Sequence, residues 1–331
     1  MEHPDKGTEV DCGDNPGALQ PAISAAQPGD TLLVRGTCEG NFTIPKDLTL
    51  IGEKHKHAVL DGNQAGTTVM VPGGPRRVVL KNLSITRGSA NDGGGIRNSG
   101  GLVLDHSIVQ NNTATHEGGG IKNDGTMLLD HSTVQNNTAT HDGGGIKNDG
   151  SMLLDHSTVQ DNTAANSGGG IHNGGGGVAT LTGSTVQNNT ATSKGGGIQD
   201  DNVLTLTDST VRGNTAAIGG GINIRNWATL TNSTVQDNTA ATGGGIYNNG
   251  AATLTGSTVQ NNTGTSKGGG IYNDGTVTLF ASKVKDNTAN GGPGSGGGIF
   301  TSQEVLLHDS EVRDNEPDNC APTGAVPGCK G

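Results

Sequence analysis

The chain has 331 residues, 59 of them Gly, and aromatic residues make up only 2% of it. This composition excludes a close-packed globular domain with a thick aromatic core. The formal net charge of −11 argues against nucleic acid or an anionic membrane as a partner. No apolar run approaches the ~20 residues of a spanning helix, so we expect no transmembrane segment.

The first 90 residues contain one helical pattern and several strand patterns, but no regular repeat. Residues 17–26 place apolar side chains at the spacing of a short amphipathic helix. Runs of apolar and β-branched residues typical of strands occupy 28–34, 47–51, 58–61 and 78–85. We expect residues 1–90 to form a capping helix and irregular first coils, because a solenoid needs its open end covered.

Residues 91–315 consist of nine copies of a repeat that begins with Gly-Gly-Gly-Ile. The Ile residues of the nine copies are Ile96, Ile121, Ile146, Ile171, Ile198, Ile222, Ile246, Ile271 and Ile299. Counting from this Ile, Leu stands at position 8, Ser at 11, Val at 13 and Asn at 16, allowing for a two-residue insertion in the fourth copy. Fixed columns at this period are the signature of a solenoid.

Each repeat contains three short runs with β-branched residues and period-two alternation, separated by Gly and Asn, which predicts three strands. Three strands in about 25 residues form one turn of an all-β parallel β-helix, in which equivalent residues stack ~4.8 Å apart. Ile, Leu and Val then form ladders inside. We expect the Asn at position 16 to bend the chain in a left-handed conformation and to bond to its neighbour in the next coil.

The four Cys residues lie in pairs near the two ends of the chain, at Cys12, Cys38, Cys320 and Cys329. A long stack of coils keeps the ends apart, which leaves Cys12–Cys38 and Cys320–Cys329 as the feasible disulfides. The second would staple a C-terminal tail, residues 316–331. Disulfides imply an oxidising compartment, so we expect a secreted or cell-surface protein. The alternative is four free thiols in a cytosolic protein.

Several motifs carry a resemblance to known proteins. The segments 19–31, 48–52 and 60–62 resemble secreted right-handed parallel β-helix proteins of the pectin-lyase-like superfold. The coils, with Gly-Gly-Gly-Ile and Val-x-x-Asn, are similar to polymorphic outer-membrane protein repeats, and the tail 317–329 resembles endings of secreted actinobacterial β-helix proteins. The resemblance implies a right-handed helix and secretion. It fixes no activity, because the superfold hosts lyases, hydrolases, epimerases and adhesins.

A candidate catalytic site comes from an Asp-His pair that recurs in the first three copies. The candidate residues are Asp105, His106, Asp130, His131, Asp155 and His156. Outward carboxylates ~5 Å apart suit a retaining glycosidase, and next-but-one carboxylates suit an inverting one. The same carboxylates could hold calcium, although we expect no cofactor. The competing interpretation is duplication, because copies two and three are nearly identical.

A second candidate is a binding face made of Thr-x-Thr on four successive copies. Its residues are Thr180, Thr182, Thr205, Thr207, Thr229, Thr231, Thr253 and Thr255. Flat Thr grids of this kind are typical of ice-binding solenoids, but Thr also favours any exposed strand.

The regularity of the repeat favours a non-catalytic protein, because insertions are only two or three residues long and no Arg or Tyr column converges on a cleft. We therefore predict a structural, adhesive or polysaccharide-binding module with no metal. The first alternative is a polysaccharide lyase or glycoside hydrolase using the Asp/His residues. The second is an ice-binding protein using the Thr face.

Overall fold

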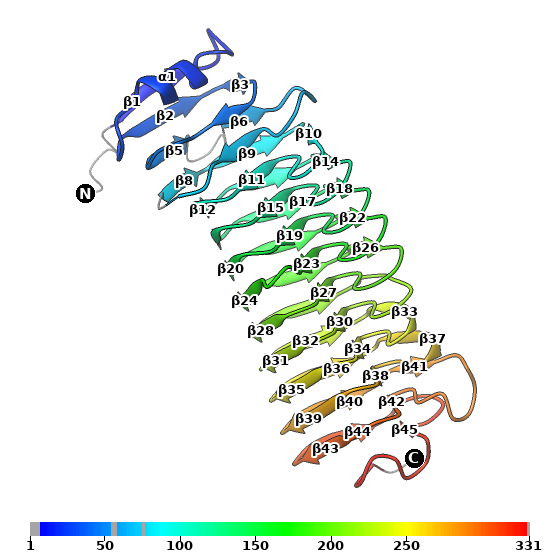
Figure 1. Cartoon of the computed structure of the whole chain (residues 1–331). Coiled ribbons are helices and arrows are strands. Elements are labelled where there is room, and N and C mark those ends of the chain that lie inside the picture. Colours follow the sequence, from blue (N-terminus) through cyan, green and yellow to red (C-terminus); the bar gives the residue numbers. More distant parts are fainter. Residues whose placement is uncertain (1–6, 54–57, 75–76, 330–331) are drawn as a thin grey trace.

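The computed structural model describes residues 7–53, 58–74 and 77–329. It confirms a right-handed parallel β-helix of about 12 turns with one helix (Figure 1). Three long parallel sheets run the length of the molecule, and each coil contributes one strand to each of them. We number the sheets in the order in which a Gly-Gly-Gly-Ile repeat enters them.

Sheet 1 holds the nine strands that follow the Gly triplets, together with β4, β7 and β45 of the terminal coils. Its strands are β4 (Phe42–Thr43), β7 (Val69–Val71), β11 (Ile96–Asn98), β15 (Ile121–Asn123), β19 (Ile146–Asn148), β23 (Ile171–Asn173), β27 (Ile198–Asp200), β30 (Ile222–Ile224), β34 (Ile246–Asn248), β38 (Ile271–Asn273), β42 (Ile299–Thr301) and β45 (Cys320–Ala321).

Sheet 2 has the longest strands: β1 (Thr8–Asp11), β2 (Thr31–Arg35), β5 (Leu48–Gly52), β8 (Arg77–Lys81), β12 (Gly101–Asp105), β16 (Thr126–Asp130), β20 (Ser151–Asp155), β24 (Val178–Thr182), β28 (Val203–Thr207), β31 (Trp227–Thr231), β35 (Ala251–Thr255), β39 (Thr276–Phe280) and β43 (Val305–His308).

Sheet 3 completes the coil: β3 (Thr37–Glu39), β6 (Ala58–Asp61), β9 (Leu83–Thr86), β13 (Ile108–Gln110), β17 (Thr133–Gln135), β21 (Thr158–Gln160), β25 (Thr185–Gln187), β29 (Thr210–Arg212), β32 (Thr234–Gln236), β36 (Thr258–Gln260), β40 (Lys283–Lys285) and β44 (Glu311–Arg313).

A fourth, short strand follows sheet 3 in most coils, which the expectation of three strands per coil missed. One row consists of β10 (Ser89–Ala90), β14 (Thr113–Ala114), β18 (Thr138–Ala139), β22 (Thr163–Ala164) and β26 (Thr190–Ala191), and a second of β33 (Thr239–Thr242), β37 (Thr263–Lys267) and β41 (Thr288–Ala289). These strands lie on the loops that return the chain to sheet 1, beside its outer surface.

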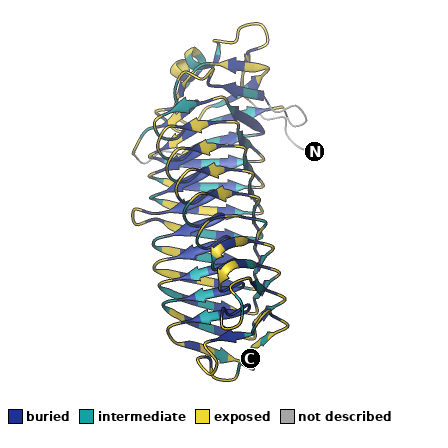
Figure 2. Ribbon diagram, turned by 90° about the vertical axis from the view of Figure 1, so that its right-hand side faces the viewer, coloured by how far each residue is buried: buried dark blue, intermediate teal, exposed yellow. Residues whose placement is uncertain are grey.

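The core is a set of stacked apolar ladders inside the coil, as the period-two alternation predicts. Leu206 of β28 is fully buried and pairs in register with Leu181 and Leu230 of the neighbouring coils. Figure 2 shows buried residues following the strands along the whole axis, while exposed residues concentrate at the corners. A thin core of this kind explains how a chain so poor in aromatic residues folds.

The Asn at position 16 stabilises the corner after sheet 3 through a buried amide ladder. The side-chain amide of Asn137 donates to Oδ1 of Asn162 at 3.0 Å and to the carbonyl of Val109 at 3.0 Å. The bonding between coils is therefore as predicted, but the left-handed residue is at position 15, as in Asn136 with φ 53°. The expectation was wrong because the ladder needs its Asn side chain inside, and the preceding exposed residue makes the turn.

The Gly triplets are required by close approach of the backbone at the corner before sheet 1. Gly118 has φ 65°, a conformation that side chains rarely adopt. A Cβ on Gly119 would lie 2.4 Å from the carbonyl oxygen of Thr138 in the next coil. The absence of a Cβ in each triplet thus allows the backbones at this corner to pack directly against one another.

Both ends of the stack are held by additional elements. Helix α1 (Leu19–Ala25) buries Leu19 and Ile23 and packs against β2 and β4 at the N-terminal end (Figure 1). The disulfides Cys12–Cys38 and Cys320–Cys329 are both present, one near each end. The single strand expected over 78–85 is two strands, because Asn82 turns the chain with φ 52°.

Among the described residues, no helix is long and apolar enough to cross a membrane.

Candidate functional site

The Asp/His residues predicted from the sequence lie together at the end of the sheet 2 strands. Asp105, Asp130 and Asp155 pair in register on β12, β16 and β20. Nδ1 of His131 lies 2.5 Å from Asp130, and Nδ1 of His156 lies 2.7 Å from Asp155. The rings of the three His residues stack on one another, with centroids 5.0 and 5.2 Å apart. The structure therefore brings all six candidates into one column.

The electrostatics at Asp105 do not resemble those of a general acid. Each carboxylate contacts the imidazole that follows it, and the His side chains are more than half exposed. Partial burial disfavours the charged form of Asp105, but hydrogen bonds from His106 and Lys81 outweigh it and lower the pKa of this carboxyl. A carboxylic acid that donates a proton needs a raised pKa instead.

The predicted Thr face also lies in register, on β24, β28, β31 and β35 of sheet 2. The column beside it is apolar and exposed, with Val178 43% exposed, Val203 40% and Trp227 63%. The indole of Trp227 therefore stands next to Thr229 and interrupts the flat grid. Towards the N-terminus the same sheet has a shallow apolar hollow of about 440 Å³, lined by residues that include Leu128, Leu153 and Thr180.

A third column, on the outer surface of sheet 1, was not singled out from the sequence. We call it the sheet 1 column; it is formed by the residue after the Ile of each coil: Arg97, Lys122, Lys147, His172, Gln199, Asn223, Tyr247, Tyr272 and Phe300. These side chains point outward, yet the five from Lys122 to Asn223 are buried. The corner before sheet 1 covers them on one side: a Cβ on Gly168 would lie 2.6 Å from Cβ of His172. Acidic residues of the turn after sheet 1 flank them on the other.

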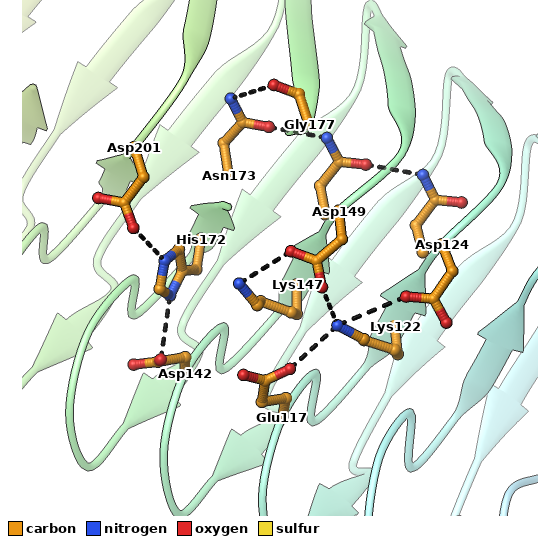
Figure 3. A network of polar contacts seen from close by, with 12 residues as sticks. Glu117, Lys122, Asp124, Asp142, Lys147, Asp149, His172, Asn173, Gly177 and Asp201 are labelled. Atoms are coloured by element: carbon orange, nitrogen blue, oxygen red, sulfur yellow. Dashed lines mark hydrogen bonds and ion pairs between the residues drawn. The ribbon is translucent and has the colours of Figure 1, made fainter. Parts of the chain in front are cut away.

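Lys122 is the centre of an ion-pair network at the N-terminal part of this column (Figure 3). Its ammonium contacts Asp149, lies 3.0 Å from Glu117 and 3.5 Å from Asp124. Burial disfavours the ammonium, but the hydrogen bonds with Asp149 and Glu117 outweigh it, so the pKa of Lys122 is raised. Lys147 of the next coil contacts Asp149 at 3.0 Å. Despite partial burial, the ion pair likewise lowers the pKa of Asp149, so Lys122 and Asp149 stabilise each other in their charged forms.

His172 continues the network and is held between two carboxylates (Figure 3). Its Nε2 lies 3.1 Å from Asp201 and its Nδ1 3.4 Å from Asp142. Burial alone would lower the pKa of His172, but hydrogen bonds to Asp142 and Asp201 raise it. Burial likewise opposes ionisation of Asp201, yet hydrogen bonds from His172 and Gln199 lower its pKa to about 2. The ion pairs therefore favour the imidazolium form of His172 and the ionised forms of Asp142 and Asp201.

A polar hollow of about 270 Å³ opens beside His172, and we call it the His172 hollow. It is lined by Asp142, Asn166, Ser167, His172, Ser193, Lys194, Gln199, Asp201 and Arg225. Gln199 is 2% exposed, and its Oε1 has no hydrogen-bond partner among the described residues. A buried acceptor without a partner in the described part of the chain thus lies in the wall of a recess whose rim includes the half-buried Lys194 and the exposed Arg225.

Asp200 lies directly behind the hollow, on the inward face of β27. Its Oδ1 accepts a hydrogen bond of 2.7 Å from the amide of Asn173, while Oδ2 is buried without a partner. Burial is the main cause that raises the pKa of Asp200 to about 6. Because Asp200 faces the core, it is a structural group and does not reach the hollow.

Towards the C-terminus the sheet 1 column becomes aromatic. The rings of Tyr247, Tyr272 and Phe300 stack with centroids 5.0 Å apart. The hydroxyl of Tyr247 donates to Asp274 at 2.9 Å, and Nζ of Lys267 lies 4.3 Å above the Phe300 ring. Partly exposed hydroxyls and ring edges thus extend the polar surface along the axis.

The comparisons with known proteins agree with the fold. A family model described as "Right handed beta helix region" matches residues 119–263, and one for the Chlamydia polymorphic membrane protein repeat matches residues 256–274. A crystal structure of pectate lyase Pel9A has 13% sequence identity and a TM-score of 0.36, covering 91% of this chain and 75% of that one. No curated protein matches the chain. The sheet order and the matching family model both describe a right-handed parallel β-helix, which is the fold of this chain.

The sheet 1 column could have been found from the sequence by asking which position varies. Ile, Leu, Ser, Val and Asn are fixed in nine copies, while the residue after the Ile changes from Arg and Lys through His, Gln and Asn to Tyr and Phe. A structural repeat constrains positions that pack between coils. A position whose residue type varies along the axis is not constrained by packing between coils, so it is a candidate for binding a ligand. The sequence analysis did not use this variation.

Proposed function

We propose that this protein is a non-catalytic, secreted or surface-associated solenoid that binds polysaccharide along the sheet 1 column. The observation that carries the proposal is the His172 hollow, where a buried acceptor with no partner among the described residues lies between charged side chains on a column whose residue type varies along the axis. The Asp/His and Thr columns offer exposed surfaces, whereas the hollow offers a recess of defined shape.

The protonation states in the hollow favour binding over catalysis. General acid-base chemistry works best when a group has a pKa near the working pH. Here the pKa of Asp201 is about 2, far below neutral pH. Lys122 is held as an ammonium, so it is no nucleophile. Fixed charges of both signs are instead suited to holding a ligand in one orientation.

The donors and acceptors of the hollow suit sugar hydroxyl groups, which both donate and accept hydrogen bonds. Asp201 and the free oxygen of Gln199 accept, while Arg225 and Lys194 donate. The column runs parallel to the helix axis, so equivalent positions repeat every ~4.8 Å along an extended chain. A polysaccharide can therefore occupy the hollow with one residue and follow the column with its neighbours.

The proposal is tested with the purified protein on a glycan array, followed by calorimetry on the glycans retained. Asp201→Asn keeps the shape of the side chain but removes its charge, and we expect it to weaken binding at least about tenfold. Asp130→Asn is the matched control, because Asp130 is also an outward carboxylate that contacts a His. Unchanged affinity in Asp201→Asn, with its fold intact by thermal melting, would contradict the proposal.

A second candidate is a polysaccharide hydrolase or lyase acting at the Asp/His residues. The in-register pairing of Asp130 with Asp155, each beside its own imidazole, is the observation that favours it. A reducing-sugar assay on the same glycans separates the two functions. Cleavage that Asp130→Asn abolishes would establish the enzyme and refute a purely binding role.

A further inference from the structure

We propose that Asp92, His116 and Glu117 form a binding site for a first-row transition-metal ion such as zinc. Asp92 lies between β10 and β11, and the other two residues lie between β14 and β15, in the next coil. The three residues therefore meet on the loops beside the N-terminal part of the sheet 1 column. The site is independent of any polysaccharide bound to the hollow.

The donor atoms have the spacing of a metal site. One ligand atom from each residue lies within 4.8 Å of the other two. Nδ1 of His116 is 2.9 Å from Oδ1 of Asp92. At metal–ligand distances of about 2.0 to 2.2 Å, two atoms so separated subtend roughly 90° at a shared ion, which coordination geometry accommodates. The ion would take the place of the proton that now joins these two atoms.

The backbone positions the three residues before any ion binds. The amide of His116 donates to the carbonyl of Asn91 at 2.9 Å, and the amide of Gly93 donates to the carbonyl of Glu117 at 2.9 Å. The amide of Glu117 also donates to Oδ1 of Asp92 at 3.3 Å. The side chain of His116 is 47% exposed, so the site is open to solvent. Preorganised ligands lower the entropic cost of binding an ion.

The surrounding charges leave room for a divalent cation. Arg97 is 3.9 Å from Oδ2 of Asp92, which is not the oxygen that faces His116. Lys122 contacts Oε2 of Glu117, so Oε1 is the oxygen available to an ion. The same ammonium is shared with two further carboxylates of the network. Four carboxylates, those of Asp92, Glu117, Asp124 and Asp149, thus face three cationic side chains, those of Arg97, Lys122 and Lys147, so the local balance is negative by one charge.

The donor set selects the kind of metal. Imidazole nitrogen with two carboxylates suits zinc and its first-row neighbours, whereas calcium and magnesium prefer oxygen donors alone. Three protein ligands leave a coordination position for water. The next coil repeats the motif as His141-Asp142, but there Asp142 contacts His172. Among the residues that the structure describes, only this group combines a His with two acids in reach of one ion.

The test is isothermal calorimetry with zinc chloride on the full chain. We expect one saturable zinc site per chain, weakened at least about tenfold by His116→Ala and by Glu117→Gln. His131→Ala is the control, because His131 is an exposed imidazole that contacts only a single carboxylate, Asp130. His131→Ala should leave the affinity unchanged.

Two results would overturn the proposal. The first is the absence of saturable zinc binding to the wild-type protein. The second is binding that survives His116→Ala but is lost in His131→Ala, which would place the ion on the stacked His residues of sheet 2. Circular dichroism and thermal melting of each variant show whether the fold is retained, and His116 is exposed enough for its removal to be tolerated.

Discussion

At the scale of single residues, the most informative position is Asp200, which interrupts an amide ladder. Asn98, Asn123, Asn148 and Asn173 form an inward row in which each amide donates to the next oxygen, with distances of 2.7 to 2.8 Å. Asp200 ends that row, and the following coil has Ile224 at the same place. A neutral carboxylic acid resembles the amide that it replaces. Ionisation instead places a buried charge against an apolar neighbour.

We therefore predict that Asp200→Asn stabilises the protein at neutral pH but not at acidic pH. The unfolded pKa is near 3.8 and the folded pKa about 6, so the wild-type protein loses stability as pH rises from about 4 to 6. The loss is roughly 3 kcal/mol at about 1.4 kcal/mol per pKa unit. Denaturant unfolding of both proteins at pH 4 and pH 7 measures it. An equal difference at both pH values would show that Asp200 does not titrate as described.

Of the two neighbouring charged residues, His172 changes stability with pH in the same direction as Asp200, and Asp201 changes it in the opposite direction. His172 has a raised pKa, so the stability that it gains from Asp142 and Asp201 is present below its unfolded pKa and is lost as pH rises through the folded value. Asp201 has a lowered pKa of about 2, so its contribution is present above the unfolded value and is lost only in acid. Comparing Asp200→Asn with the wild-type protein cancels both contributions.

At the scale of elements, each strand is held by identical strands above and below it. The Leu ladder at position 8 shows how much stability depends on this stacking. Leu206 of β28 lies between Leu181 and Leu230 and has no access to water. Thr205 on the same strand faces outward and is partly exposed. The same substitution at Leu206 and at Thr205 therefore separates the effect of burying a carboxylate from the effect of placing Asp in a strand.

We expect Leu206→Asp to unravel the coils around β28, since a buried carboxylate without a partner costs more than the about 2 to 5 kcal/mol of a Leu→Ala cavity. Thr205→Asp should change the free energy of unfolding by no more than about 0.5 kcal/mol. Chemical denaturation followed by circular dichroism compares the two. Equal, small effects would mean that position 8 does not carry the core.

At the scale of the whole molecule, a solenoid frays from its ends, because terminal coils have a neighbour on one side only. Cys12–Cys38 closes a sequence separation of 26 residues and Cys320–Cys329 one of 9. Chain-entropy estimates give about 3 to 4 kcal/mol for the longer loop and about 2 to 3 kcal/mol for the shorter. The N-terminal disulfide is therefore the stronger constraint.

Replacing both Cys12 and Cys38 by Ser should speed amide hydrogen exchange in β1, β2 and β3 more than the equivalent change at Cys320 and Cys329 does in β45. The central coils, for example β20 to β28, should keep their protection in both double variants because they have neighbours on both sides. Exchange measured by mass spectrometry resolves the coils. Uniform loss of protection along the chain would instead show that the solenoid unfolds as a single cooperative unit.

The sequence by itself determined the period, the inward ladders, the two disulfides and the register of the Asp/His and Thr columns. Each of these depends on contacts between equivalent residues, and a repeat of nearly constant length places equivalent residues next to each other. Alternation along a strand then decides which of them face the core. Three expectations failed. The left-handed residue was expected at position 16 and is at 15, and one strand was expected over 78–85 where Asn82 divides two. Most coils also have a fourth short strand that was not expected, so all three failures concern the corners and return loops.

Only the tertiary structure decided which outward column forms a site. Lys122, Lys147 and His172 alternate outward as Asp105 and Thr205 do, yet they are buried among counter-charges. The cause is the height of the flanking corners and turns above sheet 1, which the strand pattern does not encode. The corners before sheet 1 and the turns after it project outward from the sheet, and the loops of neighbouring coils meet there. That geometry converts a row of surface residues into the His172 hollow and places Asp92 beside His116.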